Sequence, residues 1–264
     1  MAPLSNDIIT ELASHLYDAE RTCNAVVKIT DAHPAMTYDD AYSIQEEIRR
    51  LKEAAGRQLV GLKMGLTSVA KMKQMGVENP IYGFLTDEQT VAEGDAISVA
   101  PLIHPRVEPE IAFVLKDALR GPDCSVDDVI QATDFVLPAL EIIDSRYENF
   151  RFDLISVVAD NTSASRFVTG GRARGLEGIN LKTLGVVMEK NGKVVQTGAG
   201  AAVLGDPAKS VATLANMLAK RGQHIPAGTF VMTGGLTAAV AVDAGDCIHV
   251  RYQELGSLTV RFTP

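Results

Sequence analysis

Apolar residues recur at helical spacing near the start of the chain. Behind the capping candidates Ser5 and Asn6, this spacing predicts a helix through Ile8, Ile9, Leu12, Leu16 and Ala19. A second helix is predicted to begin near Thr37, since Asp40 three residues on completes a capping box with a shorter acid. Its apolar stripe is Ala41, Ile44, Ile48 and Leu51. A short apolar run, residues 59–65, follows with Lys63 inside it, and Ser68 then predicts the cap of a short helix ending near Gly76.

From about residue 90 the pattern changes to short runs typical of β-strands. The predicted strands are residues 97–99, 107–115, 135–143, 166–169, 185–189, 194–197, 229–233, 247–252 and 258–262. Asn191-Gly192 between two such runs predicts a two-residue hairpin turn. One helix, residues 208–221, is expected to interrupt the strands.

This order predicts an α+β protein. We expect a helix-rich N-terminal region, residues 1–80, packed on a β-rich catalytic body, residues 81–264, because no flexible linker separates them. The alternating βαβ pattern of a nucleotide-binding sheet is missing. The glycines at 170–175 lack GxGxxG spacing, and the sequence contains no Walker A motif.

Composition narrows the class of protein. The 264 residues carry a net charge of −8 without a basic run, which argues against a nucleic-acid partner. Cys23, Cys124 and Cys247 are far apart and outside any CxxC spacing, as in reduced cysteines of a cytosolic protein. The N-terminus does not resemble a signal peptide, and no apolar run approaches the roughly 20 residues of a membrane span. We therefore expect a cytoplasmic protein.

Two acids stand close together in the predicted strand 107–115. Glu108 and Glu110 would point to one face, about 7 Å apart along the strand, and the apolar Ala112 and Val114 continue that face. Two neighbouring carboxylates repel each other when buried, and a hard divalent cation such as Mg²⁺ relieves this. The alternative is a solvated strand edge that carries two acids.

A third acid, Glu141, is embedded in the apolar run 135–143. A buried strand with a single carboxylate fits a strand that carries a metal ligand. The alternative is a salt bridge from Glu141 to Arg146 or Arg106. Together the two segments predict a carboxylate metal site.

Three further segments place polar residues in apolar settings. Lys63 could hold a substrate carboxylate or stabilise an enolate, or it could snorkel from a strand end. Residues 157–165 read as a turn that offers hydroxyls to an anion, or as a helix stop. Residues 232–237 leave a predicted strand into a glycine-rich turn whose amides could contact a carboxylate. The sequence lacks HxH, HExxH and GxSxG motifs, which argues against a zinc site or a nucleophile triad.

Six segments together resemble one known family. They match the hydratase/decarboxylase branch of the fumarylacetoacetate hydrolase superfamily in order and spacing, and they are GLKMGLTS, PIYGFLTD, HPRVEPEIAF, PALEIIDSRYENF, VVADNTSASRF and MTGGLTAAV. The resemblance implies a mixed β-roll with a helical N-terminal region. It also implies Mg²⁺, for which Mn²⁺ would substitute, held by Glu108, Glu110 and Glu141.

The same resemblance implies the remaining site residues. The motif lysine corresponds to Lys63, the motif serine to Ser163, and the glycine-rich turn to residues 233–237. We assign Lys63, Ser163 and Arg146 as catalytic groups, and a substrate surface of Lys63, Leu66, Asp160, Ser163, Thr233 and Thr237. The His–Glu pair of the hydrolase branch has no counterpart here, which argues against C–C bond hydrolysis.

The implied reaction is metal-dependent decarboxylation of a small 2-oxo dicarboxylate, 2-oxo-3-hexenedioate, in the meta-cleavage degradation of aromatics. The stretch DSRYENFRFDLISVVADN favours decarboxylation within the branch. The alternatives are hydration of 2-hydroxypenta-2,4-dienoate, a non-catalytic partner subunit, and a 2-oxo acid enzyme of another branch. We also expect a homo-oligomer, an association with the pathway hydratase, and no membrane contact.

Overall fold

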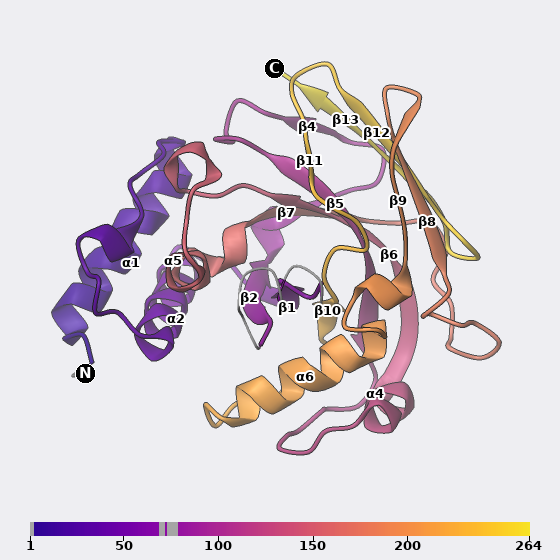
Figure 1. Cartoon of the computed structure of the whole chain (residues 1–264), viewed down its shortest axis with the longest axis horizontal. Coiled ribbons are helices and arrows are strands. Elements are labelled where there is room, and N and C mark those ends of the chain that lie inside the picture. The colour runs from indigo at the N-terminus through magenta and orange to yellow at the C-terminus, as the bar shows by residue number, and fades with distance from the viewer. Residues whose placement is uncertain (1–2, 69–71, 73–78) are drawn as a thin grey trace.

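A computed structural model of the chain describes residues 3–68, 72 and 79–264 (Figure 1). The helix expected from Ser68 to Gly76 falls largely outside these residues. No helix within the described ranges has the length and apolar character needed to cross a bilayer.

Two long helices pack together at one side of the molecule. They are α1 (Asn6–Thr22) and α2 (Tyr38–Ala54), joined by a 3₁₀ turn at Ile29–Asp31. The Ser5 hydroxyl accepts a hydrogen bond from the Ile8 N–H, and Thr37 forms the predicted capping box with Asp40. Both predicted helix starts are therefore confirmed.

The larger sheet has eight strands of mixed direction. In spatial order its main path is β2 (Ile81–Thr86), β1 (Leu59–Gly65), β10 (Phe230–Met232), β5 (Arg106–Leu115), β6 (Thr133–Ile143), β7 (Ala164–Thr169) and β3 (Thr90–Val91). The eighth, β11 (Val240–Ala241), pairs with β5 off this path. The β1–β10 and β3–β7 pairs are parallel, and the others are antiparallel.

A five-stranded sheet packs against the first. Its order is β4 (Ala96–Ser98), β13 (Gly256–Thr263), β12 (Cys247–Tyr252), β8 (Gly185–Lys190) and β9 (Lys193–Ala199). The predicted hairpin joins β8 to β9, with Asn191 and Gly192 both in the left-handed region that this tight turn requires. The hydroxyl of Tyr252 links the sheets by donating to the Ala139 carbonyl at 2.6 Å.

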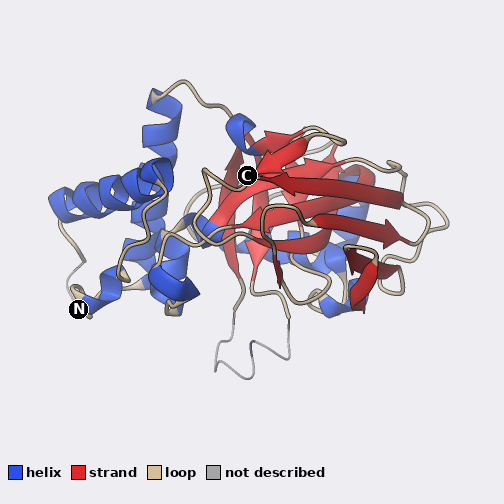
Figure 2. Ribbon diagram, turned by 90° about the horizontal axis from the view of Figure 1, so that it is seen from above, coloured by secondary structure: helices blue, strands red, loops and turns tan. Residues whose placement is uncertain are grey.

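Shorter helices complete the fold. They are α4 (Val126–Ala132), α5 (Leu154–Ala159), α6 (Pro207–Ala219) and 3₁₀ turns at Asp87–Gln89, Glu148–Phe150, Asn161–Ser163 and Gly200–Ala202. Figure 2 shows α1, α2 and α5 gathered on one side and the two sheets on the other. The expected α+β organisation is confirmed.

The predicted division at residue 80 needs a correction. Strand β1 belongs to the first 80 residues in sequence, yet it lies inside the larger sheet between β2 and β10. The helical layer thus ends near Ala54, where α2 ends. Helices α4 and α5 and strands β2, β3 and β11 were not predicted. All six residues of β2 are buried, so no alternation of apolar and polar positions marks it.

The interior holds two apolar clusters. The large one lies between the sheets and under the helices. The small one lies on the sheet face that carries Glu110 and Glu141, and consists of Leu85, Ala112, Ala139, Ala164, Phe167 and Met232. The buried glutamates therefore have a packed apolar cluster beside them on the same face of the sheet.

Candidate metal centre and substrate cavity

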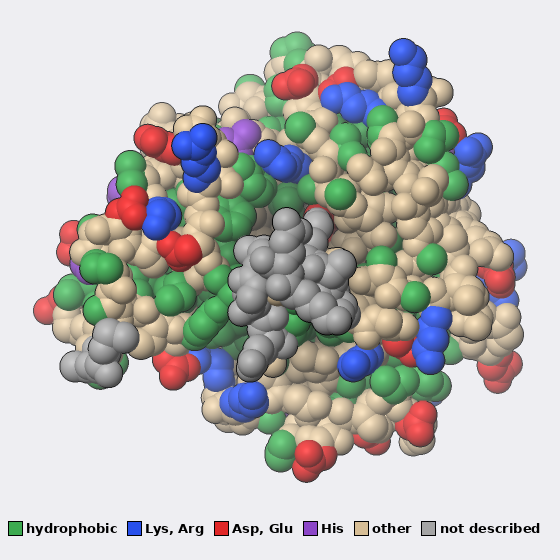
Figure 3. Space-filling model, in the orientation of Figure 1, with side chains coloured by type: hydrophobic (Ala, Val, Ile, Leu, Met, Phe, Trp, Pro, Cys, Tyr) green, Lys and Arg blue, Asp and Glu red, His purple; other side chains and the backbone are tan. Residues whose placement is uncertain are grey.

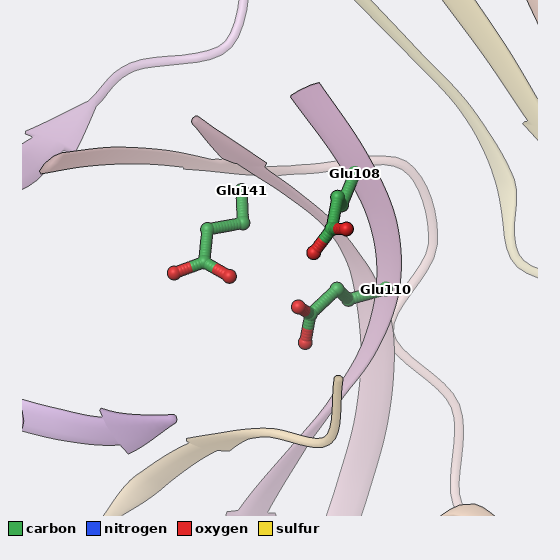
Figure 4. A group of neighbouring side chains, drawn as sticks. All are labelled: Glu108, Glu110 and Glu141. Atoms are coloured by element: carbon green, nitrogen blue, oxygen red, sulfur yellow. The ribbon is translucent and has the colours of Figure 1, made fainter. Parts of the chain in front are cut away.

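The three predicted ligands meet on one face of the larger sheet. Strands β5 and β6 are antiparallel, with Glu108 directly opposite Glu141 and Glu110 opposite Ala139. Residues two apart on a strand share a face, so all three carboxylates point the same way. One oxygen from each lies within 4.8 Å of the others, and Figure 4 shows the groups converging on a common space. The predicted common face of Glu108 and Glu110 is confirmed, and the strand pairing adds Glu141 to it. The alternative of a solvated strand edge is not what the structure shows.

Burial makes this cluster electrostatically demanding. Glu110 is 0% exposed and Glu141 1%. Within the described residues, Glu110 Oε1 and Glu141 Oε2 have no hydrogen-bond partner. Burial first, and then the charge of Glu141, raises the pKa of Glu110 well above its ordinary value. The unpartnered, buried oxygens of Glu110 and Glu141, with the Glu108 carboxylate close to both, fit a hard divalent cation such as Mg²⁺.

Lys63 borders the cluster from β1. Its side chain is 3% exposed, and its Nζ lies 2.8 Å from Glu141 Oε1. The ammonium also donates to the Thr162 carbonyl at 3.1 Å. Lys63 is thus buried inside the site, and the alternative of a lysine that snorkels to solvent is wrong. Glu141 therefore forms its ion pair with Lys63, and the alternative of a salt bridge to Arg146 or Arg106 is wrong.

A tight turn after α5 supplies the next polar groups. Asn161, Thr162 and Ser163 all have positive φ, at 47°, 51° and 58°. Three consecutive left-handed residues other than glycine are costly, so surrounding contacts must hold them. The Asn161 amide does so by bonding Phe84 of β2 twice, donating to its carbonyl at 3.0 Å and accepting from its N–H at 2.9 Å. A Cβ at Gly83 would lie 2.6 Å from Thr162 Oγ1, so the turn can rest on β2 only because residue 83 is glycine.

The turn aims two groups at the cavity. The Thr162 carbonyl reaches Lys63, and the Ser163 hydroxyl is buried without a hydrogen-bond partner among the described residues. The sequence left open a helix stop or an anion-binding loop in this region. Both features occur here, since α5 ends at Ala159 and Ser163 lines the cavity.

Arg146 and Asp160 lie behind the turn. The guanidinium is ion-paired with the Asp160 carboxylate and donates to the carbonyls of Asp144 and Ala164 at 2.8 and 2.9 Å. Burial alone would lower the pKa of Arg146, but Asp160 raises it, so the guanidinium stays charged. Neither side chain lines the cavity. We therefore revise the predicted catalytic role of Arg146 and the predicted substrate contact of Asp160 to positioning of the 160–163 turn.

The predicted glycine-rich turn closes the site from the other side. The Gly234 N–H donates to Glu110 Oε2 at 2.6 Å, and the Thr233 hydroxyl donates to the Ile111 carbonyl at 2.8 Å. Gly234 has a φ of +109°, and a Cβ there would lie 2.1 Å from Thr67 Oγ1. Thr233 is committed to the backbone and does not line the cavity, whereas Thr237 does.

These groups surround a cavity of about 330 Å³. Its metal end includes Lys63, Glu108, Thr162 and Ser163, and the predicted Leu66 also lines it. Another part of its lining is an apolar wall of Ile143, Phe150, Phe152, Leu154 and Val157. Figure 3 shows apolar side chains gathered on this face, between the helical side and the β-rich side of the molecule. A larger hollow of about 610 Å³, between α2, β1, β2 and the end of α6, contacts none of the three glutamates.

The sequence reasoning missed the apolar wall. Phe150 and Phe152 lie in a loop, and Leu154 and Val157 in the short α5. The only sequence feature of this loop is the alternation of Phe150 and Phe152 in ENFRF. Outside a strand, such alternation does not predict which residues the two rings contact.

Known proteins resemble the chain over nearly its full length. A family profile described as fumarylacetoacetate (FAA) hydrolase C-terminal matches residues 58–263. A 4-oxalocrotonate decarboxylase of Pseudomonas putida is 61% identical over 259 residues, which cover 98% of each chain. A 2-hydroxyhexa-2,4-dienoate hydratase of Comamonas testosteroni is 39% identical over 250 residues, which cover 94% of this chain and 95% of the hydratase.

A solved structure agrees with the sequence relatives. The 4-oxalocrotonate decarboxylase of Pseudomonas putida G7, complexed with magnesium and adipate, superposes with a TM-score of 0.97 at 60% identity. The match covers 99% of this chain and all of that one. The fold expected from the sequence is thereby confirmed, and the chain belongs to the fumarylacetoacetate hydrolase family.

Proposed function

We propose that the protein is a Mg²⁺-dependent carboxy-lyase that converts 4-oxalocrotonate (2-oxo-3-hexenedioate) to 2-hydroxypenta-2,4-dienoate and CO₂. The observation that carries the proposal is the cluster of Glu108, Glu110 and Glu141 beside Lys63, next to a cavity that also has an apolar wall. The relative at 61% identity is named for this substrate, and its structural counterpart holds magnesium and a six-carbon dicarboxylate.

Glu108, Glu110 and Glu141 would hold the Mg²⁺, and Mn²⁺ would fit the same oxygen ligands. When bound, the ion supplies Lewis acidity to the carboxylate and 2-oxo oxygen of the substrate. The Gly234 N–H fixes the orientation of Glu110 by its bond to Oε2. The backbone therefore orients one ligand before any ion arrives, which lowers the entropy cost of assembling the site.

Decarboxylation breaks the C5–C6 bond of the substrate. The electron pair of that bond moves through C4 and C3 and reaches the 2-oxo oxygen, which becomes an enolate oxygen. Lys63 lies beside the cluster with two of its neighbours already in place, Glu141 and the Thr162 carbonyl. We assign the ammonium to the enolate oxygen, where its charge stabilises the developing anion and its proton can complete the enol. The Ser163 hydroxyl orients the proximal carboxylate.

The apolar wall of the cavity is suited to the release of CO₂. Phe150, Phe152 and Val157 offer no hydrogen bonds from their side chains, so a carboxylate near them loses hydration while neutral CO₂ does not. The distal end of the cavity therefore favours the product of the bond cleavage over the charged reactant.

The second candidate is hydration of 2-hydroxypenta-2,4-dienoate on the same scaffold. Hydratase relatives at 39% identity support it, and the decarboxylase relative at 61% favours decarboxylation. The experiment is to incubate the purified protein with 4-oxalocrotonate and with 2-hydroxypentadienoate, with Mg²⁺ and with EDTA. We expect CO₂ release from the first substrate only, abolished by EDTA and restored by Mg²⁺ or Mn²⁺. Hydration without CO₂ release would reverse the choice, and chelator-insensitive turnover would remove the metal from the proposal.

We further propose a cytoplasmic homo-oligomer that associates with the pathway hydratase. The feature that supports self-association is β9, which lies at the end of its sheet and exposes Val194 and Val195. Exposed apolar side chains on an edge strand are typical of strands that pair with another chain. Light scattering of the protein alone, and then mixed with the hydratase, tests both associations.

A further inference from the structure

The proposed substrate carries two carboxylates, and the residues that line the cavity provide binding groups for only one of them. The metal end offers three acids for a cation, together with Lys63. Among the described residues that line the cavity, Lys63 is the sole lysine, arginine or histidine. A distal carboxylate beside a purely apolar wall would be bound weakly, because an uncompensated charge loses its hydration there. A cation just outside that wall would therefore complete the binding of such a substrate.

Arg106 stands at the required place on the sheet. It lies two residues before Glu108 on β5, so it shares the sheet face of the metal ligands at a distance of about 7 Å along the strand. Its direct partner across the β5–β6 pair is Ile143, which lines the cavity. A six-carbon dicarboxylate has five carbon–carbon bonds of about 1.5 Å between its end carbons, so its carboxylates are a similar distance apart.

The guanidinium of Arg106 is held ready for a ligand. Its Cζ lies 4.3 Å from the centroid of the Phe150 ring, and the ring itself forms part of the apolar wall. A guanidinium stacked on an aromatic face keeps its N–H donors pointing outward in its own plane. No carboxylate in the described ranges forms an ion pair with Arg106, although many other arginines of the chain have one.

The same aromatic ring has a second polar neighbour. His104 lies 5.1 Å from Phe150 between ring centroids, and its buried Nε2 has no hydrogen-bond partner within the part of the chain that the structure describes. Both backbone N–H groups of Ile103 and His104 are already committed to Asp144. Arg106 thus brings a cation to this ring, and His104 Nε2 is a second polar atom beside it.

We infer that Arg106, stacked on Phe150, binds the distal carboxylate of the substrate and selects dicarboxylates over monocarboxylates. This inference rests on the proposed function and deepens it. Stacking places the charge at the rim of the apolar wall and not within it, so the carboxylate is attracted to the cavity while its C5–C6 bond stays among apolar side chains. Arg106 is therefore a binding residue, and its loss acts on KM more than on kcat.

The test measures binding and needs no turnover. Arg106→Gln and the conservative Arg106→Lys are loaded with Mg²⁺, and the affinities for adipate and for oxalate are measured by calorimetry. Adipate spans both ends of the cavity, whereas oxalate is short enough to occupy the metal end alone. Arg151→Gln is the matched control, because it removes the same charge from an exposed residue next to Phe150.

We expect Arg106→Gln to weaken adipate about 10- to 100-fold, as for a lost charge-assisted hydrogen bond, and to leave oxalate unchanged. Arg106→Lys should fall between the wild type and Arg106→Gln, and Arg151→Gln should bind both ligands normally. Unchanged adipate affinity in Arg106→Gln overturns the inference, and so does an equal loss of both ligands. Since binding is read without catalysis, a failure here is distinct from a wild-type protein that releases no CO₂.

Discussion

The two ends of the substrate cavity are built in different ways. At the metal end, Glu108, Glu110 and Glu141 stand on the paired strands β5 and β6, and Lys63 comes from β1 of the same sheet. At the distal end, Phe150 and Phe152 belong to a loop with left-handed residues, and α5 adds one short turn of helix. Strand pairing places side chains with less freedom than a loop does.

This difference suggests a division of tasks, with the reaction at the metal end and substrate selectivity at the distal end. A sheet that positions charged groups rigidly is suited to the enolate chemistry that decarboxylases and hydratases of the family would share. A loop can change its residues without disturbing the strands, so the distal end is where substrates of different length and charge can be told apart. The four predictions below test this separation, in order of decreasing effect.

Glu110→Gln should give the largest loss. Glutamine keeps the shape of the side chain but removes a charged ligand oxygen, so we expect kcat/KM for CO₂ release to fall by about 10³-fold or more at saturating Mg²⁺. Thermal unfolding in EDTA should show no loss of stability, because the substitution removes a repelling buried charge. Activity within tenfold of the wild type would contradict the assignment of the metal end.

Lys63→Met should distinguish the catalytic role of the lysine from the metal-binding role of the three glutamates. We expect kcat to fall about 10²- to 10³-fold, as for loss of a group that stabilises the transition state, while Mg²⁺ affinity is retained. Lys52→Met is the matched control, since the side chain of Lys52 is likewise buried and pairs with two acids, Glu20 of α1 and Glu88 of the turn after β2. It should lower the melting temperature and leave kcat unchanged. A normal kcat in Lys63→Met would remove Lys63 from the chemistry.

Asn161→Ala should affect both ends, because the turn that it holds lies between them. The variant loses two hydrogen bonds to Phe84, and we expect about tenfold lower kcat/KM and about 2 kcal/mol lower stability. Asn216 makes the same double bridge to the backbone of Cys124, far along the chain from the site. Asn216→Ala should therefore lose similar stability without losing activity. Equal activity losses in both variants would show that Asn161 acts only through stability.

Asp40→Asn should have the smallest effect and spare both ends of the cavity. Burial raises the pKa of Asp40, but hydrogen bonds from Leu4 and Thr37 outweigh it, so the pKa lies below its ordinary 3.8. A depressed folded pKa contributes stability above the unfolded value of 3.8, and this is lost as the pH falls through the folded value. We expect the variant to be about 1 kcal/mol less stable at pH 7 in urea unfolding, with unchanged kcat. The stability difference should narrow below pH 3.8, and a constant difference would contradict the shift.

Local sequence patterns predicted the elements that depend on local physics. The caps at Ser5 and Thr37, the Asn191-Gly192 turn and the strand at residues 247–252 all occur as expected. Period two placed Glu108 and Glu110 on one face of a strand. Other predicted strands differ from the observed ones by a few residues at their ends, where hydrogen bonding to neighbours decides the boundary.

Longer-range features needed the tertiary structure. Strand β2 is buried along its whole length, so its pattern could not distinguish a strand from a helix. Strand β1 joined the body of the protein only through its pairing with β10 and β2. Arg146 and Asp160 resembled site residues in sequence, but the fold pairs them with each other behind the turn.

The sequence by itself predicted three glutamates on strands, placed Glu108 and Glu110 on one face, and through resemblance indicated the family chemistry; the pairing of β5 with β6 brought Glu141 to that face. Only the tertiary structure decided which groups surround them. The Lys63–Glu141 pair joins residues from β1 and β6, and the Arg106–Phe150 stack joins a strand to a distant loop. The physical reason is that strand periodicity is local, whereas the partner of a buried charge is whichever side chain the strand order and loops bring within reach.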